Sequence, residues 1–339
     1  MPAVRARDHG IVIGRVPTGP ANAITDVPGV AVGHASHAPD NTGVTVIVPR
    51  AASDTWLEPV YAGVAVLNGA GELTGSIQIR EWGVMETPVF LTATPYVGAV
   101  YHAATQVLGE RQPGIGVDDV IIPVIGECDS SGVIDVVRGP APDAALIRAA
   151  LDGAGTGAVG EGQIGAGIGM HCSDFAGGIG TASRTCAGYS VGVLLLVNFG
   201  DWEELRIAGR LAGVEAPNRG VDGSCIAVVA TDAPLLPGGL ERLARRAFLG
   251  LARAGSYASN GSGEIAIAFS TANADCARRG APDVVRPEML RSEALHSLLF
   301  AATAEAAEEA VINALLGAHT LVGPRGTAHA FPVDRLPQA

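Results

Sequence analysis

The sequence predicts one domain that combines a β-sheet core with packed helices, of the α/β or α+β class. Three observations support this prediction. Short runs rich in β-branched residues recur along the chain, helical patterns stand between and after them, and no linker-like stretch divides the 339 residues. Hydrophobic residues make up 48% of the chain and charged residues 17%, which is enough apolar material for a large core.

The expected strands are runs of four to seven mostly apolar residues. Because both faces of such a run are apolar, each run suits a strand that other layers cover on both sides. The runs are residues 44–48, 64–67, 89–92, 120–125, 191–197 and 226–230.

Helical patterns are expected at residues 96–108, 142–151 and 238–254. In the third, leucines and an alanine repeat at helical spacing, and Gly255 is a natural helix end. These helices would cover the faces of the sheet core.

A longer, alanine-rich helix is expected at residues 292–316. At 100° per residue, Glu305 and Glu309 fall on the same apolar stripe as Ile312, whereas Glu308 points elsewhere. Two carboxylates on an apolar stripe need partners if they are buried. The stripe is therefore either a partly exposed edge of the helix or faces a functional site.

Composition excludes several functions. All 22 basic residues are arginine, so the lysines of P-loops, Schiff-base enzymes and kinases are absent. The net charge of −12 disfavours nucleic acid as a partner, and no apolar run approaches the length of a membrane span. Five dispersed cysteines without a CxxC pair predict reduced thiols, so we expect a cytoplasmic protein.

Two short motifs carry weak signals. The glycines within residues 160–165 match GxGxxG, but they follow a helical pattern rather than a strand, which favours tight turns over a nucleotide site. His34 and His37, with Asp40 nearby, could form half of a metal site, but no second ligand pair stands at metal spacing. A polar loop is favoured there, and no metal or organic cofactor is expected.

The segment 256–264 joins a loop of glycine, serine and asparagine to the start of a patterned strand. Ser262 could attack the carbonyl of Gly261, and an N→O acyl shift followed by hydrolysis would leave Ser262 as a new N-terminus. Its freed α-amine, with a reference pKa of about 7.7–8.0, could then act as the base for its own hydroxyl. Asn-Gly-Ser-Gly is also an ordinary turn before a strand, and spacing alone does not decide between the two readings.

Over nearly its whole length the sequence resembles the L-aminopeptidase/D-esterases and β-peptidyl aminopeptidases, which are self-processing N-terminal-nucleophile peptidases of the DmpA type. The matching segments are residues 22–30, 32–34, 42–45, 66–69, 71–75, 126–129, 177–184, 197–200, 260–263 and 305–310. The resemblance implies an α+β, four-layer αββα sandwich of the DmpA/ornithine acetyltransferase-like kind. It also implies cleavage between Gly261 and Ser262 into residues 1–261 and 262–339, and assembly of the processed heterodimers as a tetramer.

The resemblance also implies roles for single residues. Ser262 matches the nucleophile, and Asn198 matches an asparagine whose amide helps to form the oxyanion hole. Glu305 matches a glutamate beside the nucleophile, and Thr303 matches a serine that contacts the new amine. Glu127 matches a carboxylate that receives the ammonium group of the substrate. Purely structural roles stay open, since Asn198 could cap a turn and Glu127 could end a solvated strand.

Three positions depart from the pattern of the family. Asp129 stands where some members have a tyrosine that assists the oxyanion, and residues 93–98 lack a histidine that many relatives have. Thr303 replaces the usual serine. These changes concern the substrate pocket more than the nucleophile, so the type of reaction is better defined than the substrate.

The sequence therefore predicts a self-processing serine aminopeptidase or amidase. Its substrates would be small peptides, amino-acid amides or esters with a free amine, hydrolysed through an acyl-enzyme. Two alternatives remain at this stage. One is a self-cleaving acyltransferase of the ornithine acetyltransferase type, against which serine in place of threonine argues, and the other is an uncleaved, non-enzymatic oligomeric binding protein.

Overall fold

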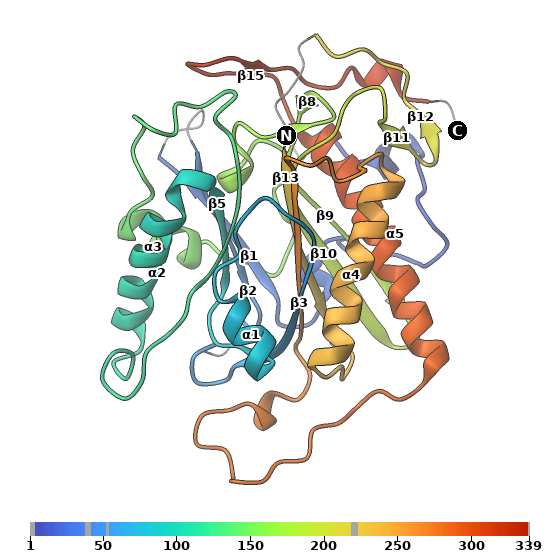
Figure 1. Cartoon of the computed structure of the whole chain (residues 1–339). Helices are drawn as coiled ribbons and strands as arrows, with labels where there is room; N and C mark the ends of the chain where they lie inside the picture. Colours follow the sequence, from blue (N-terminus) through green and yellow to red (C-terminus); the bar gives the residue numbers. More distant parts are fainter. Residues whose placement is uncertain (1–3, 38–41, 52–53, 218–222, 338–339) are drawn as a thin grey trace.

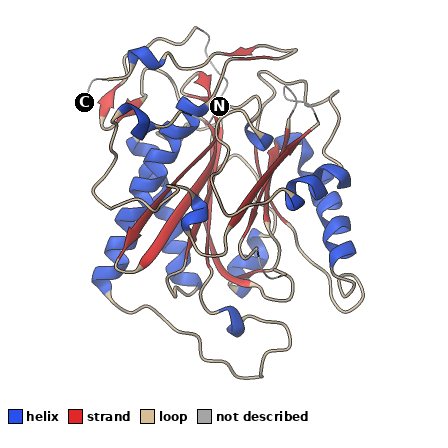
Figure 2. Ribbon diagram, turned by 180° about the vertical axis from the view of Figure 1, so that it is seen from behind, coloured by secondary structure: helices blue, strands red, loops and turns tan. Residues whose placement is uncertain are grey.

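A computed structural model describes residues 4–37, 42–51, 54–217 and 223–337 of the protein (Figure 1). Two β-sheets pack face to face, and helices cover the outer face of each sheet (Figures 1 and 2). The four-layer αββα sandwich implied by the resemblance is confirmed.

The first sheet has four strands in the order β1-β2-β5-β6, and only β5 and β6 run parallel. Helices α2 and α3 pack on its outer face. The bounds are β1 (Ala31–Ser36), β2 (Gly43–Val48), β5 (Val89–Ala93), β6 (Val124–Cys128), α2 (Val97–Arg111) and α3 (Ala144–Asp152).

The second sheet has six strands in the order β4-β3-β14-β13-β10-β9, and only β13 and β14 run parallel. Helices α4 and α5 cover its outer face. The bounds are β3 (Val60–Gly69), β4 (Val84–Met85), β9 (Gly178–Cys186), β10 (Tyr189–Asn198), β13 (Ser224–Thr231), β14 (Gly263–Ser270), α4 (Pro237–Arg253) and α5 (Glu293–Gly317).

Shorter elements complete the described chain. They are α1 (Ser76–Trp82), the strand pairs β7 (His171–Cys172) with β8 (Phe175–Ala176), β11 (Arg206–Ile207) with β12 (Arg210–Leu211) and β15 (Leu321–Val322) with β16 (Thr327–Ala328), and six 3-10 turns (Ala6–His9, Ile24–Asp26, Thr94–Tyr96, Gly165–Gly167, Ala274–Cys276 and Val333–Arg335). No helix among the described residues is long and apolar enough to cross a membrane.

Successive side chains of the central strands point alternately into the space between the sheets and toward the covering helices. On β10, Leu194 and Leu196 pack between the two sheets, whereas Val193 and Leu195 pack against α4 and α5. Successive side chains of a strand point to opposite faces, so a strand covered on both sides needs an apolar residue at every position. This requirement explains the continuous apolar runs from which these strands were predicted.

One expected strand is shorter than predicted, and another strand of the core was not predicted. The run 120–125 is a strand only from Val124, and Val120 is 66% exposed. Pro123 cannot donate a backbone hydrogen bond, so pairing begins after it. Strand β9 was not predicted because its sequence opens within a glycine cluster. Gly180 is needed there, since a Cβ at this position would lie 1.9 Å from the carbonyl oxygen of Ala310 on α5.

Replacement of Gly180 by alanine is expected to lower the free energy of unfolding by about 1–3 kcal/mol, because α5 must move away from β9. Gly98→Ala in α2 is the matched control, since a Cβ at Gly98 would meet no atom within 4 Å. That control should be neutral or slightly stabilising. Urea-induced unfolding of both variants tests the prediction, and equal stability of the two would contradict it.

Helix α5 is enclosed along most of its length, so the stripe of Glu305 and Glu309 is not a partly exposed edge, and Glu308 is buried as well although it lies off that stripe. Glu305, Glu308 and Glu309 are all buried, and Glu308 pairs with Arg253 of α4 at 2.6 Å. The N-terminal segment also covers α5, because Arg7 reaches Glu309 at 2.8 Å. Each carboxylate therefore has a partner, as burial of a charge requires.

Candidate active site

The predicted site lies at one end of the two-sheet core, where β13 and β14 begin and β6 and β10 end. A cavity of about 640 Å³ opens at this end, and its lining includes Glu127, Asp129, Gly223, Ser224 and Gly261. The structure thus brings together Glu127 and Gly261, two of the residues selected from the sequence, and adds a second Gly-Ser pair.

Asn198 is the last residue of β10 and is held from both ends of its side-chain amide. Its Nδ2 donates to the carbonyl oxygen of Asp129 at 2.9 Å, and its Oδ1 accepts from the backbone N–H of His171 at 2.9 Å. Asn198 is 2% exposed and directly opposes Ser224 in the antiparallel register. A neutral donor fixed beside a serine suits stabilisation of an oxyanion.

Ser224 is the first residue of β13 and faces the space between the sheets. It is in register with Asn198 on one side and with Gly263 on the other. Residues in register share a face of the sheet, and Ile226, two positions along, packs between the sheets. Ser224 therefore points toward the side of the sheet on which Glu127 and the cavity lie.

Sequence reasoning missed Ser224 although the signal was present. Gly223 and Ser224 immediately precede an apolar strand, the same pattern that selected Gly261 and Ser262. The pairing of β13 with β10 was needed to show that only one of the two serines directly opposes Asn198.

Ser262 lies just before β14 and is turned toward a different partner. Its hydroxyl donates to Oε1 of Glu264, a residue that sequence analysis did not select. Glu264 is in register with Cys225, whose side chain packs on the helix-covered face, so Ser262 bonds to a carboxylate on the opposite face from Ser224. Burial raises the pKa of Glu264, and the hydrogen bond from Ser262 partly offsets this.

Glu127 is the carboxylate best placed for a substrate amine. Its Oε1 accepts from the backbone N–H of Glu72 at 2.8 Å, and its Oε2 accepts from the hydroxyl of Thr94. Burial raises the pKa of Glu127, and the charges of Asp129 and Glu72 add to this, while the two hydrogen bonds act in the opposite direction. The group is 3% exposed and lines the cavity, as a receptor for an ammonium group should.

The structure does not bring Glu305 to Ser262. Glu305 Oε1 and Oε2 accept from the backbone N–H groups of Arg15 and Val16, both at 2.9 Å, and Oε2 lies 3.4 Å from Arg184 Nε. Arg184 pairs across the sheet with Val191, Val191 pairs with Thr231, and Thr231 pairs with Ser270, which is the last residue of β14. Arg184 therefore lies at the same height along the strands as Ser270. At about 3.3 Å per residue, the distance along β14 from Ser270 to Gly263 is roughly 20 Å or more.

Thr303 lies on the same part of α5 as Glu305 and is also away from the cavity. Its hydroxyl donates within the helix to the carbonyl oxygen of Leu299 at 2.8 Å, and the residue is fully buried. The expectation that Thr303 and Glu305 stand beside Ser262 is therefore not met, because α5 carries them to the opposite end of β9.

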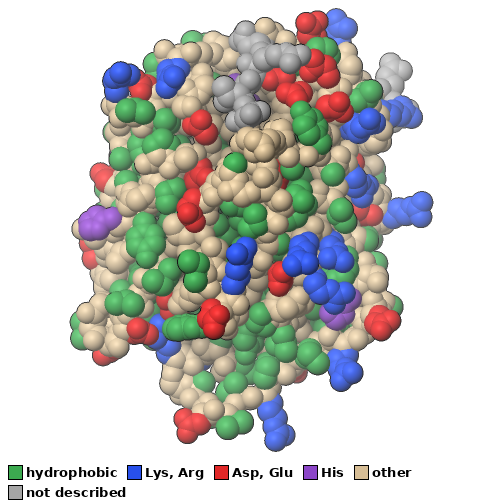
Figure 3. Space-filling view, viewed as in Figure 1, with side chains coloured by type: hydrophobic (Ala, Val, Ile, Leu, Met, Phe, Trp, Pro, Cys, Tyr) green, Lys and Arg blue, Asp and Glu red, His purple; other side chains and the backbone are tan. Residues whose placement is uncertain are grey.

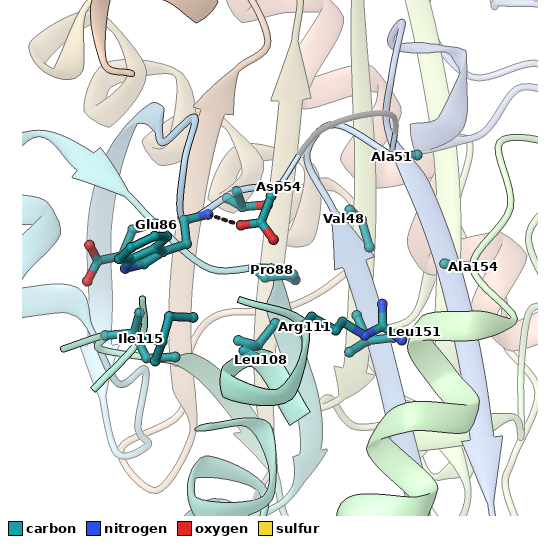
Figure 4. Close-up of a pocket in the computed structure, with 13 residues that line it drawn as sticks. Val48, Ala51, Asp54, Glu86, Pro88, Leu108, Arg111, Ile115, Leu151 and Ala154 are labelled. Atoms are coloured by element: carbon teal, nitrogen blue, oxygen red, sulfur yellow. Dashed lines mark hydrogen bonds between the residues drawn. The ribbon is translucent and has the colours of Figure 1, made fainter. Parts of the chain in front are cut away.

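A second cavity, of about 150 Å³, lies away from this site and is drawn in Figure 4. Apolar side chains such as Val48, Leu108 and Leu151 line it together with Arg111 and Asp54, whose Oδ1 accepts from the backbone N–H of Trp56 at 2.8 Å. Its lining includes Thr55 but neither Asn198 nor Glu127, so no oxyanion donor or amine-binding carboxylate selected from the sequence stands beside that hydroxyl.

The histidine pair does not form a metal site within the described residues. Nδ1 of His34 lies 3.0 Å from the Thr45 hydroxyl, and burial lowers the pKa of His34 to about 4. His37 contacts the carbonyl oxygen of Ala141, and Asp40 lies outside the described residues. No group of three or more His, Cys, Asp or Glu side chains in the described ranges could hold a metal ion.

Comparison with known proteins identifies the family. The profile of peptidase family S58 matches residues 22–329. Beta-peptidyl aminopeptidase BapA of Sphingosinicella microcystinivorans is 40% identical over 372 residues, covering 99% of this chain and 90% of that protein.

Two solved structures are similar to this chain over nearly its whole length. The PH0078 protein of Pyrococcus horikoshii OT3 matches with a TM-score of 0.90 and 41% identity, covering 97% of this chain and 96% of that one. The L-aminopeptidase D-Ala-esterase/amidase of Ochrobactrum anthropi, described as a variant of the Ntn hydrolase fold, matches with a TM-score of 0.89 and 37% identity, covering 98% of this chain and 96% of that one. With the fold, the cavity and these matches in agreement, the chain belongs to peptidase family S58 and is a hydrolase of the aminopeptidase type.

Proposed function

We propose that this aminopeptidase activates itself by one cut in its own backbone, before a serine at the cavity end of the second sheet. It then hydrolyses small peptides, amino-acid amides or esters that carry a free amine. The observation that carries the proposal is the pairing of Asn198 with Ser224, which follows a glycine and lines the same cavity as Glu127.

Two Gly-Ser bonds are candidates for the cut. The sequence favours Gly261–Ser262, whereas the geometry favours Gly223–Ser224. Ser224 lines the cavity and opposes Asn198, whereas the hydroxyl of Ser262 is held by Glu264. We therefore propose Ser224 as the nucleophile and assign Ser262 and Glu264 to the neighbouring strand as supporting groups.

The self-cleavage step can be written with these residues. The hydroxyl of Ser224 attacks the carbonyl carbon of Gly223, and the peptide C–N bond breaks as the ester bond forms and the nitrogen gains a proton. Water hydrolyses the ester, which leaves the carboxylate of Gly223 and a free α-amine on Ser224. This amine, with a reference pKa of about 7.7–8.0, is partly unprotonated at neutral pH and can serve as the base.

Substrate hydrolysis then follows the same chemistry on an external carbonyl. The ammonium group of the substrate binds Glu127, and the α-amine of Ser224 accepts the hydroxyl proton as its oxygen attacks the carbonyl carbon. Asn198 Nδ2 donates to the developing oxyanion, the leaving amine takes the proton, and water releases the acyl group. Asp129 stands where the resemblance led us to look for a tyrosine, and Asn198 donates to the backbone of that residue.

The masses of the fragments test the proposal directly. Cleavage before Ser224 gives chains of 223 and 116 residues, and cleavage before Ser262 gives chains of 261 and 78 residues. Denaturing mass spectrometry is expected to show the first pair. An amine-labelling reagent offers a second readout, because the chain contains no lysine and the cut creates one new primary amine. A single intact chain with full activity would contradict self-processing.

Binding of the substrate amine is expected to weaken in acid. The raised pKa of Glu127 means that this carboxylate becomes protonated at a higher pH than an ordinary glutamate. KM for an aminoacyl amide should therefore rise as the pH falls through that raised pKa, while Glu127→Gln should show a high KM without this pH dependence. Initial rates of both enzymes across an acid pH series check the prediction, and parallel pH profiles would contradict it.

We further propose that processed heterodimers assemble, as a tetramer, in the cytoplasm. The proposal is supported by exposed apolar side chains on β3 and on α1, which packs against β3, including Leu67, Ile77 and Trp82, which are 57%, 84% and 67% exposed. Figure 3 shows apolar side chains on the face of the molecule that carries α1 and α4, with arginines beside them. The five cysteines are free thiols, which suits a reducing compartment. Native mass spectrometry measures the assembly, and a heterodimer alone would contradict it.

A further inference from the structure

A cation stands on the rim of the cavity that contains Ser224. Arg325 lies in the turn between β15 and β16, and it lines this cavity together with Glu127 and Asp129. In Figure 1 this hairpin crosses the top of the molecule, the end at which β13 begins. The cavity therefore combines a positive group at its rim with carboxylates on its wall.

Backbone contacts hold the turn that carries Arg325. The N–H of Arg325 donates to the carbonyl oxygen of Val133 at 3.1 Å, and Gly323 donates to Gly326 at 2.9 Å. Gly323 packs so closely that a Cβ there would lie 2.3 Å from the Val133 oxygen. Val136, a few residues further along the same loop, lines the cavity as well. The backbone of Arg325 is thus fixed beside a wall of the cavity, and its exposed side chain lines the cavity.

Among the residues that the structure describes, the charged side chains that line the cavity do not form ion pairs with one another. Within the described ranges, no hydrogen bond or ion pair involves the guanidinium group of Arg325. Glu127 accepts from Thr94 and Glu72, and Asp129 accepts from the N–H of Ser131 at 2.8 Å and from its hydroxyl at 2.7 Å. A ligand with an ammonium group at one end and a carboxylate at the other would meet an opposite charge at both ends.

We propose that Arg325 binds the carboxylate of the leaving amino acid, so that short peptides with a free C-terminus are preferred over the corresponding amides. This inference rests on the proposed function. A substrate whose ammonium group binds Glu127 presents its carbonyl to Ser224, and the part beyond the scissile bond then extends toward the rim. The planar guanidinium group can donate two parallel hydrogen bonds to a carboxylate there.

The size of the cavity fits this class of ligand. About 640 Å³ lies within the range of small-molecule sites, which measure about 300–1,000 Å³, and it suits a dipeptide or tripeptide. A long peptide would place its C-terminal carboxylate outside the cavity and would lose the contact with Arg325. The arginine therefore selects for length as well as for charge.

The test compares kcat/KM for a dipeptide with kcat/KM for the same dipeptide amidated at its C-terminus. In the wild-type enzyme we expect a charge-assisted hydrogen bond to raise kcat/KM for the free acid about 10- to 100-fold above that for the amide. Arg325→Met should bring this ratio close to one, with the loss falling on the free acid, and Arg325→Lys should retain part of it. Arg286→Met, at an exposed arginine of the loop between β14 and α5, is the matched control and should keep the wild-type ratio.

The outcomes separate this inference from the proposed function. A wild-type ratio near one, or an unchanged ratio in Arg325→Met, would overturn the role of Arg325 while hydrolysis of the amide still supported the aminopeptidase activity. Failure of the wild-type enzyme to hydrolyse either substrate would overturn the proposed function and this inference with it. Denaturing mass spectrometry confirms that each variant is cut like the wild type before rates are compared.

Discussion

Replacement of Ser224 by alanine is expected to leave one uncut chain of 339 residues and to lower kcat/KM by about 10⁴-fold or more. The variant lacks the hydroxyl that attacks Gly223, so no α-amine is released and neither nucleophile nor base is formed. Denaturing mass spectrometry measures the cut, and hydrolysis of a chromogenic aminoacyl amide measures the activity.

Two further variants make the test specific. Ser262→Ala should still be cut before Ser224, because the Ser262 hydroxyl is bound to Glu264 and does not line the cavity. Ser224→Thr keeps a hydroxyl and should also be cut, although more slowly. The opposite pattern, with Ser262→Ala intact and Ser224→Ala cut, would show that the sequence interpretation selected the correct serine.

The strands of the core could be predicted because their signal is local. A strand covered on both faces needs a continuous apolar run, and both β10 and β13 have one. Strand β9 has no such run, since Gly180 is required by the close approach of α5. That requirement comes from a helix more than 100 residues away in the sequence, so no local pattern could reveal it.

The candidate site also depends on contacts between residues that are distant in the sequence. Asn198 and Glu127 were selected from the sequence and lie at the same end of the core, with Glu127 in the cavity. The choice between Ser224 and Ser262 depended on strand register, which a single sequence does not encode in any visible pattern. Both serines follow a glycine and precede an apolar strand. The opposition of Ser224 to Asn198, its place in the cavity lining and the bond of Ser262 to Glu264 separate them.

Glu305 illustrates what a helical wheel leaves out. The wheel gives the direction of a side chain around the helix axis, and it placed Glu305 and Glu309 on one apolar stripe, where both are buried. It does not show which part of the neighbouring strands the residue packs against. The ion pair of Glu309 with Arg184 at 2.7 Å places this part of α5 at the end of the sheet far from the cavity.

Arg184→Met is expected to lower the free energy of unfolding by about 3–5 kcal/mol, the usual cost of breaking a buried ion pair, because Glu309 then keeps only the partly exposed Arg7 as a charged partner. Arg184 is 0% exposed, and its guanidinium group donates to Glu309, Glu305 and the carbonyl oxygen of Ile13. Urea-induced unfolding in a Ser224→Ala background measures this loss on an uncut chain. Arg148→Met removes an exposed partner of Glu110 and should leave the stability nearly unchanged.

A second substitution distinguishes the loss of a charged partner for Glu309 from the loss of packing. Burial raises the pKa of Glu309, but the hydrogen bond from Arg7 and the charge of Arg184 outweigh it, so the pKa of Glu309 lies below its usual value. The carboxylate is therefore ionised at neutral pH, and its stabilising contribution is lost only as the pH falls through that lowered pKa. Addition of Glu309→Gln to Arg184→Met should recover part of the lost stability, because the buried carboxylate that has lost its buried arginine is replaced by a neutral amide. If the double variant is no more stable than Arg184→Met, the arginine stabilises the fold through packing and its bonds to backbone carbonyls instead.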